Sequence, residues 1–294
     1  MKILFIGTVE FSYRALNCLL ENDYNVVGLI TKKVSKYNAD FYDLTPLSKR
    51  YAVPVMYRTK DNEAELISFI TEKLPDVIYC FGWSHILSKK ILILPPYGVV
   101  GFHPAELPNN RGRHPIIWAL FLGLQQTASS FFIMDKGADT GDIISQEIIK
   151  IENDNAASLY NKIIDVALKQ ILIFSEQLQN KDGHIQRTSQ YNNEGNAWRK
   201  RGKYDGKIDF RMSSKAIVNL VNSLSKPYFG AHFVFDDEDV VVWKAIEEDT
   251  VFNNLEPGKV LDVEGNEIIV KTYDSAIRII EHEFNKLPVK GDYL

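Results

Sequence analysis

The sequence is poor in cysteine and has no long apolar run. It contains two cysteines among 294 residues, Cys18 and Cys80, and both lie in apolar segments. We therefore expect buried free thiols in a reducing compartment, which predicts a cytoplasmic location. No apolar run approaches the ~20 residues that a membrane-spanning helix needs, and no group of cysteines and histidines has the spacing of metal ligands. We predict no membrane association and no metal site.

The chain also lacks an excess of basic residues. It has 34 lysines and arginines against 38 aspartates and glutamates, so its formal net charge is −4. Proteins that bind nucleic acids usually show a basic balance or a basic stripe, and we therefore expect no nucleic-acid partner. One basic cluster, residues 198–203, is typical of a solvated linker, although it could also contact phosphates.

A glycine fingerprint for a dinucleotide cofactor is missing as well. Residues 2–7 are typical of a strand, 11–22 of a helix and 26–31 of a second strand. This opening predicts a right-handed, parallel βαβ unit. The turn after the first strand has the sequence Gly7-Thr8-Val9-Glu10 and lacks the Gly-x-Gly-x-x-Gly pattern, which disfavours a bound dinucleotide.

The remaining periodicity predicts an α/β domain followed by a smaller β-rich part. Strands at 76–81 and 127–134 and a long helix at 156–179 extend the first half to a Rossmann-like, mostly parallel sheet of at most seven strands. Residues 182–203 are rich in asparagine, glycine and arginine and are typical of a linker. Five short strands follow, at 233–235, 240–245, 259–263, 268–271 and 276–280. We predict domains at residues 1–190 and 205–294, the second a small antiparallel sheet or partial barrel.

The stretch from Tyr97 to Gln146 carries the candidate chemistry. His103 follows a short apolar segment, and Asp139 lies 36 residues later between Gly137 and Gly141. Loops at the carboxyl ends of strands in one sheet emerge at the same edge, where open α/β folds bind ligands. A histidine and a carboxylate there could manage protons during acyl transfer to an amine. Taken singly, a loop histidine is more often a polar surface residue, and an aspartate between glycines is more often part of a turn.

This stretch resembles the formyltransferases that use N10-formyltetrahydrofolate. Their signature is Asn-x-His-x-Ser-Leu-Leu-Pro-x-x-Arg-Gly-x-x-Pro, with Asp-x-Gly on a later loop. The chain has His103, Leu107-Pro108, Arg111-Gly112, Pro115 and Asp139-Thr140-Gly141 in register. The resemblance extends from the N-terminus to about residue 242. It implies a small C-terminal subdomain like an OB-fold, an enzyme that transfers a formyl group, and catalytic roles for His103 and Asp139.

Further site residues are expected from the resemblance and from their places at strand ends. The folate donor is expected to contact residues of four segments: Phe81, Trp83 and Ser84; Pro104; Leu107 and Pro108; Gly137 and Asp139. Trp83 could flank a flat pteridine ring or be a core residue, and the two readings stay open. The acceptor is expected to contact Arg111, Gly7 and Thr8, although a salt bridge within the loop is an alternative for Arg111.

One position departs from the family signature. The asparagine that lies two residues before the histidine is Gly101 in this chain, and Ala105-Glu106 replaces Ser-Leu. That asparagine is the group credited with holding the formyl oxygen. Either another donor replaces it, such as a backbone N–H near Gly101 or an ordered water, or the rate is reduced, or the activity is lost.

The acceptor is the last expectation. One branch of the family formylates aminoacyl-tRNA, and another formylates a nucleotide-linked amino sugar on the way to surface polysaccharide such as lipopolysaccharide. Three features favour the sugar branch: a short segment after residue 31 that includes Asp40 and Asp43, the acidic balance, and the sequences at 206–210 and 227–231. We expect a nucleotide-sugar substrate and a homodimer. Methionyl-tRNA formylation, folate hydrolysis and non-catalytic folate binding remain as alternatives.

Overall fold

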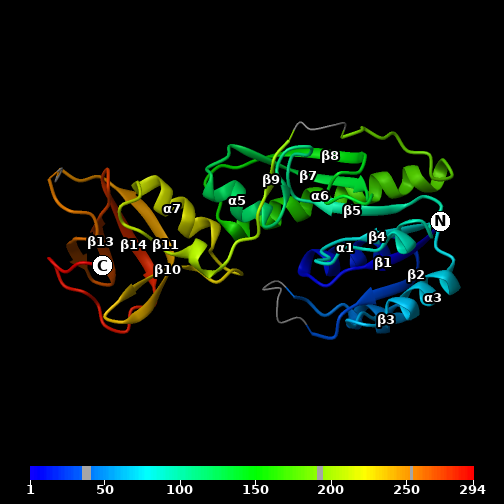
Figure 1. Ribbon diagram of the computed structural model, residues 1–294, viewed down its shortest axis with the longest axis horizontal. Helices are drawn as coiled ribbons and strands as arrows, with labels where there is room; N and C mark the ends of the chain where they lie inside the picture. Colours follow the sequence, from blue (N-terminus) through cyan, green and yellow to red (C-terminus); the bar gives the residue numbers. More distant parts are fainter. Residues whose placement is uncertain (35–40, 191–194, 252–253) are drawn as a thin grey trace. The chain divides into compact units, whose positions relative to one another are not determined.

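The computed structural model describes residues 1–34, 41–190, 195–251 and 254–294. The chain divides into two compact units (Figure 1). The first comprises residues 1–115, 127–149 and 161–198, and the second comprises residues 116–126, 150–160 and 199–294. Asp40 of the expected acidic segment lies outside the described residues, whereas Asp43 accepts hydrogen bonds from the backbone and the hydroxyl of Thr45. Among the described residues, no helix is long and apolar enough to cross a membrane.

The first unit is built on a seven-stranded sheet. Its order is β3-β2-β1-β4-β5-β7-β8. The strands are β1 Lys2–Ile6, β2 Asn25–Thr31, β3 Val55–Tyr57, β4 Val77–Cys80, β5 Val99–His103, β7 Gln126–Ile133 and β8 Ile143–Lys150. Neighbours from β3 to β5 pair in parallel, and β7 is antiparallel to β5. The predicted mostly parallel α/β fold is confirmed.

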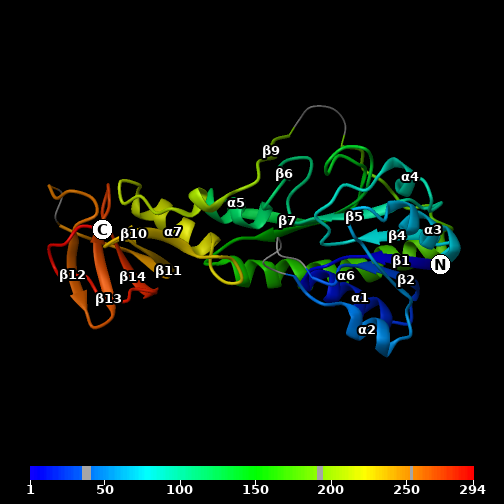
Figure 2. The same cartoon turned by 60° about the horizontal axis from the view of Figure 1, so that its bottom comes forward.

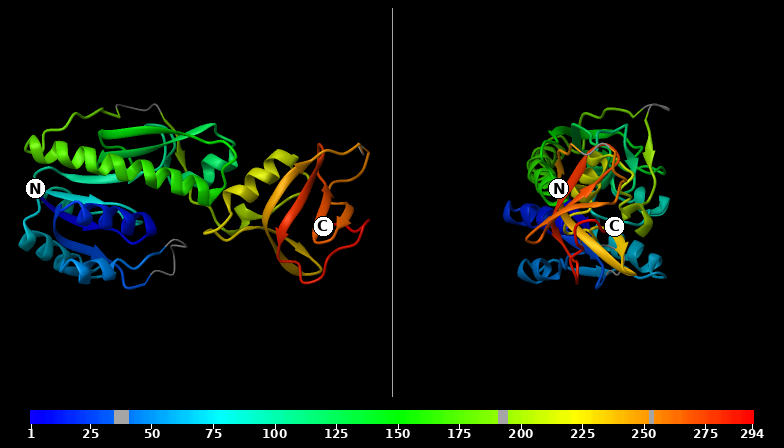
Figure 3. Two further views of the ribbon diagram at one scale, coloured as in Figure 1. Left: turned by 180° about the vertical axis from the view of Figure 1, so that it is seen from behind. Right: turned by 90° about the vertical axis from the view of Figure 1, so that its left-hand side faces the viewer.

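Helices cover both faces of this sheet, as Figure 2 shows. They are α1 Glu10–Glu21, α2 Thr45–Arg50, α3 Glu63–Lys73, α4 Lys89–Leu92 and α6 Ala156–Asn180. The view from behind shows α1 and α6 on one face (Figure 3). Because side chains alternate along a strand, Tyr79 and Phe81 point to that face and contact Phe174 and Phe11. Ile78 and Cys80 point to the opposite face and pack with Leu66, on α3, and Ile91, on α4.

The two cysteines are free thiols, as predicted. Cys80 is buried, and desolvation raises the pKa of its thiol to about 12. Cys18 is only half-buried, which corrects the expectation for that residue.

Strand β8 is a second difference from the sequence expectation, because residues 143–150 were not expected to be a strand. Most of its side chains are only partly buried, so its sequence lacks the clear alternation of a strand with one buried face.

The second unit contains a five-stranded antiparallel sheet of order β10-β11-β14-β13-β12. Its elements are α5 Pro115–Phe121, η1 Lys203–Gly206, α7 Ser214–Ser223, β10 Ala231–Phe235, β11 Glu238–Glu248, β12 Val260–Glu264, β13 Glu267–Lys271 and β14 Ala276–His282. Ser213 caps α7 by accepting a hydrogen bond from the Ala216 N–H. Residues of α5 and α7 share an apolar core with the sheet. The predicted β-rich C-terminal part is confirmed.

Candidate active site

His103 is the last residue of β5, an interior strand between β4 and β7 in the seven-stranded sheet. It was expected on a loop, but it still pairs with Ser130 of β7, and its side chain is only 5% exposed. The ring Nε2 lies 2.7 Å from the backbone oxygen of Asn110. A carbonyl oxygen can only accept a hydrogen bond, so Nε2 carries the proton in this arrangement. Nδ1 is therefore the nitrogen that is left to gain and release a proton.

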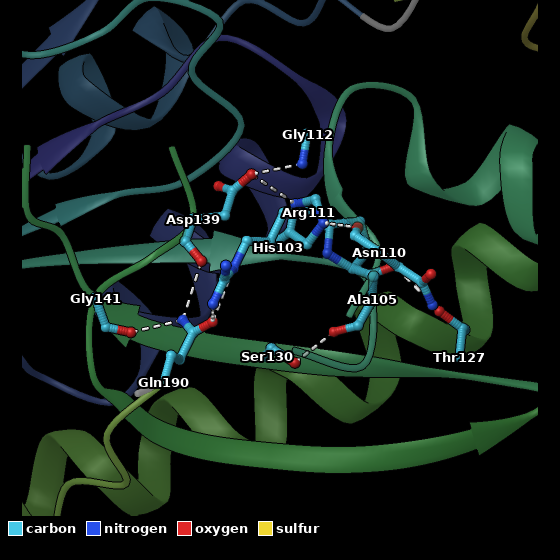
Figure 4. Close-up of polar contacts among 11 residues, drawn as sticks. His103, Ala105, Asn110, Arg111, Gly112, Thr127, Ser130, Asp139, Gly141 and Gln190 are labelled. Carbon is cyan, nitrogen blue, oxygen red and sulfur yellow. Dashed lines mark hydrogen bonds and ion pairs between the residues drawn. The ribbon is translucent and has the colours of Figure 1, made fainter. Parts of the chain in front are cut away.

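Asp139 faces Nδ1 from a second loop. Its Oδ2 lies 3.6 Å from His103 Nδ1, within the range of an ion pair but too far for a hydrogen bond. The same oxygen accepts a hydrogen bond of 3.0 Å from the Gly112 N–H, which holds the carboxylate in place (Figure 4). The structure thus brings together the two residues that the sequence predicted as catalytic.

The Asp139 loop is a tight turn whose glycines are required by space. A Cβ at Gly141 would lie 1.7 Å from the backbone oxygen of Ile133, and a Cβ at Gly137 would lie 2.1 Å from Thr140 Oγ1. Asp139 itself has a φ of +58°, which aspartate tolerates better than most residues. Asp135 closes the turn by accepting hydrogen bonds from the Gly137 N–H and the Thr140 hydroxyl.

Gln190 joins the two loops, and the sequence did not single it out. Its Oε1 accepts hydrogen bonds from Nε and Nη2 of Arg111, on the loop that follows His103. Its Nε2 donates to the backbone oxygens of Asp139 and Gly141, at 3.0 and 2.6 Å. Figure 4 shows Gln190 between these groups. No sequence signal marked Gln190, because it lies in a polar segment that resembles a linker. This segment is held beside β8, where Thr188 pairs with Ile143, and Gln190 follows two residues later.

We expect Gln190→Ala to lower kcat about 10- to 100-fold, since shifts of about 1 Å in reacting groups have effects of this size. The KM for the donor should change little, because Gln190 positions Arg111 and Asp139 and is 8% exposed. Steady-state kinetics with Gln190→Ala, Gln190→Glu and the exposed control Gln186→Ala test this. Glutamate keeps the acceptor for Arg111 but loses the donors to the Asp139 loop, so it should not restore the rate. A fully active Gln190→Ala enzyme would contradict the positioning role.

The loop between His103 and Arg111 is held by a second set of polar contacts. Ser130 donates to the Ala105 oxygen at 2.6 Å, Thr127 donates to the Pro104 oxygen, and Gln146 donates to the Leu107 oxygen. The Asn110 N–H donates to Asn196 Oδ1, and Arg111-Gly112 (β6) pairs in parallel with Ala197-Trp198 (β9). The carbonyl that fixes the His103 ring is therefore itself fixed by a residue far along the chain.

The position of the family asparagine is filled by other side chains. A Cβ at Gly101 would lie 2.8 Å from Phe132 Cζ and 2.8 Å from Met134 Cγ. Phe132 lies opposite Gly101 in the antiparallel pairing of β5 and β7. The space beside Gly101 is thus occupied and is not a simple gap left by a shorter residue.

We expect Gly101→Asn to give no gain in kcat and to lower the melting temperature. The new Cβ would force Phe132 and Met134 to move, and overpacking of this kind costs about 1–3 kcal/mol. Kinetics and thermal unfolding measure both effects, with Gly101→Ala as a control that adds the Cβ without the amide. A tenfold or larger rise in kcat for Gly101→Asn would show that the site merely lacks the amide.

The other predicted site residues lie in different environments. Phe81 is fully buried among Phe5, Phe11, Tyr79 and Phe131, so its side chain belongs to the core. Gly7 and Thr8 form the turn before α1, where Thr8 is buried and donates to the Gly82 oxygen. Trp83 and Ser84 follow β4 and are partly buried. Pro104 and Pro108 are partly buried, and Leu107 is 3% exposed.

Comparison with known proteins shows the family to which this chain belongs. The model of the family described as "Formyl transferase" matches residues 1–174, and that of its C-terminal domain matches residues 201–292. The chain belongs to the formyl transferase family. It is 33% identical over 288 residues to methionyl-tRNA formyltransferase of Caldanaerobacter subterraneus subsp. tengcongensis, covering 96% of this chain and 91% of the relative.

The fold is shared by solved structures, of which two were determined with a bound folate. HypX from Aquifex aeolicus, in complex with tetrahydrofolic acid, has a TM-score of 0.67 and 18% identity, over 99% of this chain and 48% of HypX. The chain thus spans about half the length of HypX. An N-formyltransferase from Helicobacter canadensis, in complex with folinic acid and dTDP-3-aminofucose, has a TM-score of 0.69 and 17% identity, over 96% of this chain and all of that one.

Family membership makes this chain a formyltransferase, as the signature around His103 predicted. Among the described residues, no group of three or more histidine, cysteine, aspartate or glutamate side chains is arranged to hold a metal ion. At the carboxyl end of β5, the structure brings His103 and Asp139 together with the loops that hold them.

Proposed function

We propose that this formyltransferase moves a formyl group from N10-formyltetrahydrofolate to the amino group of a nucleotide-linked amino sugar. The observation that carries the proposal is the His103–Asp139 pair, with Nε2 fixed by the Asn110 carbonyl and Nδ1 facing the carboxylate. Bound folates in two structures of the same fold support the donor. We place the donor against Trp83, Ser84, the 104–108 segment and the Gly137–Asp139 turn.

The neutral amine attacks the formyl carbon, so that a new C–N bond forms and the carbonyl oxygen becomes an oxyanion. His103 Nδ1 accepts the proton that the amine loses. The negative charge of Asp139, whose Oδ2 lies 3.6 Å from Nδ1, stabilises the resulting imidazolium. Collapse of the intermediate breaks the bond between the formyl carbon and N10 of the folate, and the proton passes to N10. The oxyanion is stabilised by His103 and by a backbone N–H or an ordered water in place of the missing amide.

The acceptor is the least constrained part of the proposal. The dTDP-3-aminofucose complex of the Helicobacter canadensis enzyme and the net charge of −4 favour a nucleotide sugar. Methionyl-tRNA is the second candidate, because it is the acceptor named for the relative at 33% identity. A homodimer and a cytoplasmic location remain predictions.

The proposal is tested with a labelled formyl donor and a panel of acceptors. We expect label in nucleotide-linked amino sugars and none above background in methionyl-tRNA. Faster labelling of the tRNA would replace the acceptor assignment. Titration with 5-formyltetrahydrofolate, followed by tryptophan fluorescence, tests the donor separately. An absence of binding at millimolar concentration would rule out the folate-dependent reaction.

A further inference from the structure

Three cationic side chains and a histidine lie after strands β2, β3, β4 and β6, outside the His103–Asp139 pair. We name this group the basic cluster, and its members are Lys32, Arg58, His85 and Arg113. Strands β2, β3 and β4 end at the same edge of the parallel sheet. Arg58 is tied to the end of β2 by a hydrogen bond from its N–H to the Thr31 oxygen. Arg113 donates to the Ser84 oxygen at 3.5 Å and directly follows Gly112, whose N–H holds Asp139.

Two members of the basic cluster, Lys32 and His85, contact each other directly. The Lys32 Nζ lies 2.6 Å from His85 Nε2. An ammonium group can only donate, so His85 accepts and its ring is neutral in this pair. Burial, followed by the charges of Lys32, Arg58 and Arg113, lowers the pKa of His85. Within the described part of the chain, no acidic side chain forms an ion pair with any of the four residues.

An aromatic ring and two unused polar groups adjoin the basic cluster. The Lys32 ammonium lies 5.5 Å from the centre of the Trp83 ring, and the His85 ring packs edge-on against it. Among the described residues, the buried Trp83 Nε1 has no acceptor, and the Thr31 hydroxyl, in a residue with no exposed surface, has no partner. Donors that are buried without partners are costly unless a ligand or water satisfies them.

We propose that the basic cluster is a subsite for an oxyanion carried by a substrate, and that it takes the carboxylates of the glutamate tail of the folate donor. In that donor an aromatic benzoyl ring is linked through an amide to the carboxylates, which matches an aromatic ring and an unused N–H beside a group of cations. A diphosphate of a nucleotide sugar offers the same chemistry from a second source. The identity of the anion rests on the proposed function, whereas the subsite itself does not.

The experiment compares donors that differ only in the tail. Calorimetric titration uses the N-methylamide of 5-formyltetrahydropteroate, which keeps the benzoyl amide but has no glutamate and no carboxylate, and 5-formyltetrahydrofolate with one and with three glutamates. We expect the glutamate-bearing forms to bind the wild-type protein about tenfold more tightly or better, as for charge-assisted hydrogen bonds. Lys32→Met should remove most of that gain and leave the affinity for the methylamide unchanged. Lys90→Met, which removes an exposed charge on α4, is the matched control.

The pH dependence gives a readout that a structural role would not change. The anion favours protonated His85, whose pKa is lowered in the free protein. The gain from the tail should therefore grow as the pH falls from 8 to 6 and be accompanied by proton uptake. His85→Gln should flatten this dependence. The groups that face His85 are Lys32 after β2, Arg58 after β3 and Arg113 after β6. Burial and the charge of Arg58 lower the pKa of Lys32 as well, so a bound anion favours the charged form of both residues.

Inorganic pyrophosphate is the second probe, and it separates the outcomes. If the tail gives no gain, but pyrophosphate binds and loses affinity in Lys32→Met, the anion comes from the acceptor and the assignment to the donor tail is overturned. If neither ligand responds to Lys32→Met, the subsite is overturned. If no folate binds at all, the proposed function fails, and the pyrophosphate titration alone decides the subsite.

Discussion

Replacing His103 by alanine is expected to reduce kcat by about 10²–10⁴-fold, the usual contribution of a positioned general acid–base group. Nδ1 is the nitrogen left free to exchange a proton, because Nε2 is bonded to the Asn110 carbonyl at 2.7 Å. The effect should fall on kcat more than on the donor KM, since the side chain is almost completely buried at the end of β5.

His103→Gln and His184→Ala complete the test. Glutamine fills the same space and keeps a donor for the Asn110 carbonyl, but it cannot accept a proton, so its kcat should be as low as that of the alanine variant. His184 is exposed, and its replacement should leave kcat unchanged. Thermal unfolding of both His103 variants shows whether the low rates come from the lost side chain or from loss of the folded state, because an unchanged melting temperature excludes the latter. A His103→Gln enzyme with near wild-type turnover would remove His103 from proton transfer.

Asp139→Asn is expected to have the second large effect, also about 10²–10⁴-fold on kcat. The asparagine keeps an oxygen to accept the Gly112 N–H, so the loop should hold its shape. It carries no charge, and the imidazolium that forms during transfer loses its counter-ion 3.6 Å away. Removing the equivalent charge from a buried serine-protease triad costs a similar factor.

The matched control is Asp182→Asn, which removes an exposed carboxylate from a residue that also has a positive φ. It should retain full activity. An Asp139→Asn enzyme with wild-type kcat would show that the carboxylate serves only the loop.

Several parts of this protein could be predicted from sequence because they depend on local pattern. Within residues 2–31, two short apolar segments flank a segment with helical spacing, and this pattern predicts a βαβ unit. The apolar runs at 76–81 and 127–134 predict buried strands. The family signature around His103 and Asp139 marks both residues without coordinates. Strand β8 escaped prediction because its mixed exposure leaves no clear periodicity.

The tertiary structure alone decided which groups meet at the site. Gln190 contacts Arg111 across 79 residues of chain, and Asn196 contacts Asn110 across 86. Such pairs depend on loop closure, which no local pattern encodes. The antiparallel register of β5 and β7 puts Phe132 opposite Gly101, and the sheet order brings Lys32 to His85. The sequence by itself determined the fold class and the two candidate catalytic residues, because these follow from periodicity and motif. Only the folded chain determined which nitrogen of His103 is protonated, how Gln190 joins Arg111 to the Asp139 loop, and which side chains occupy the space beside Gly101. Each of these depends on distances between atoms from separate strands and loops.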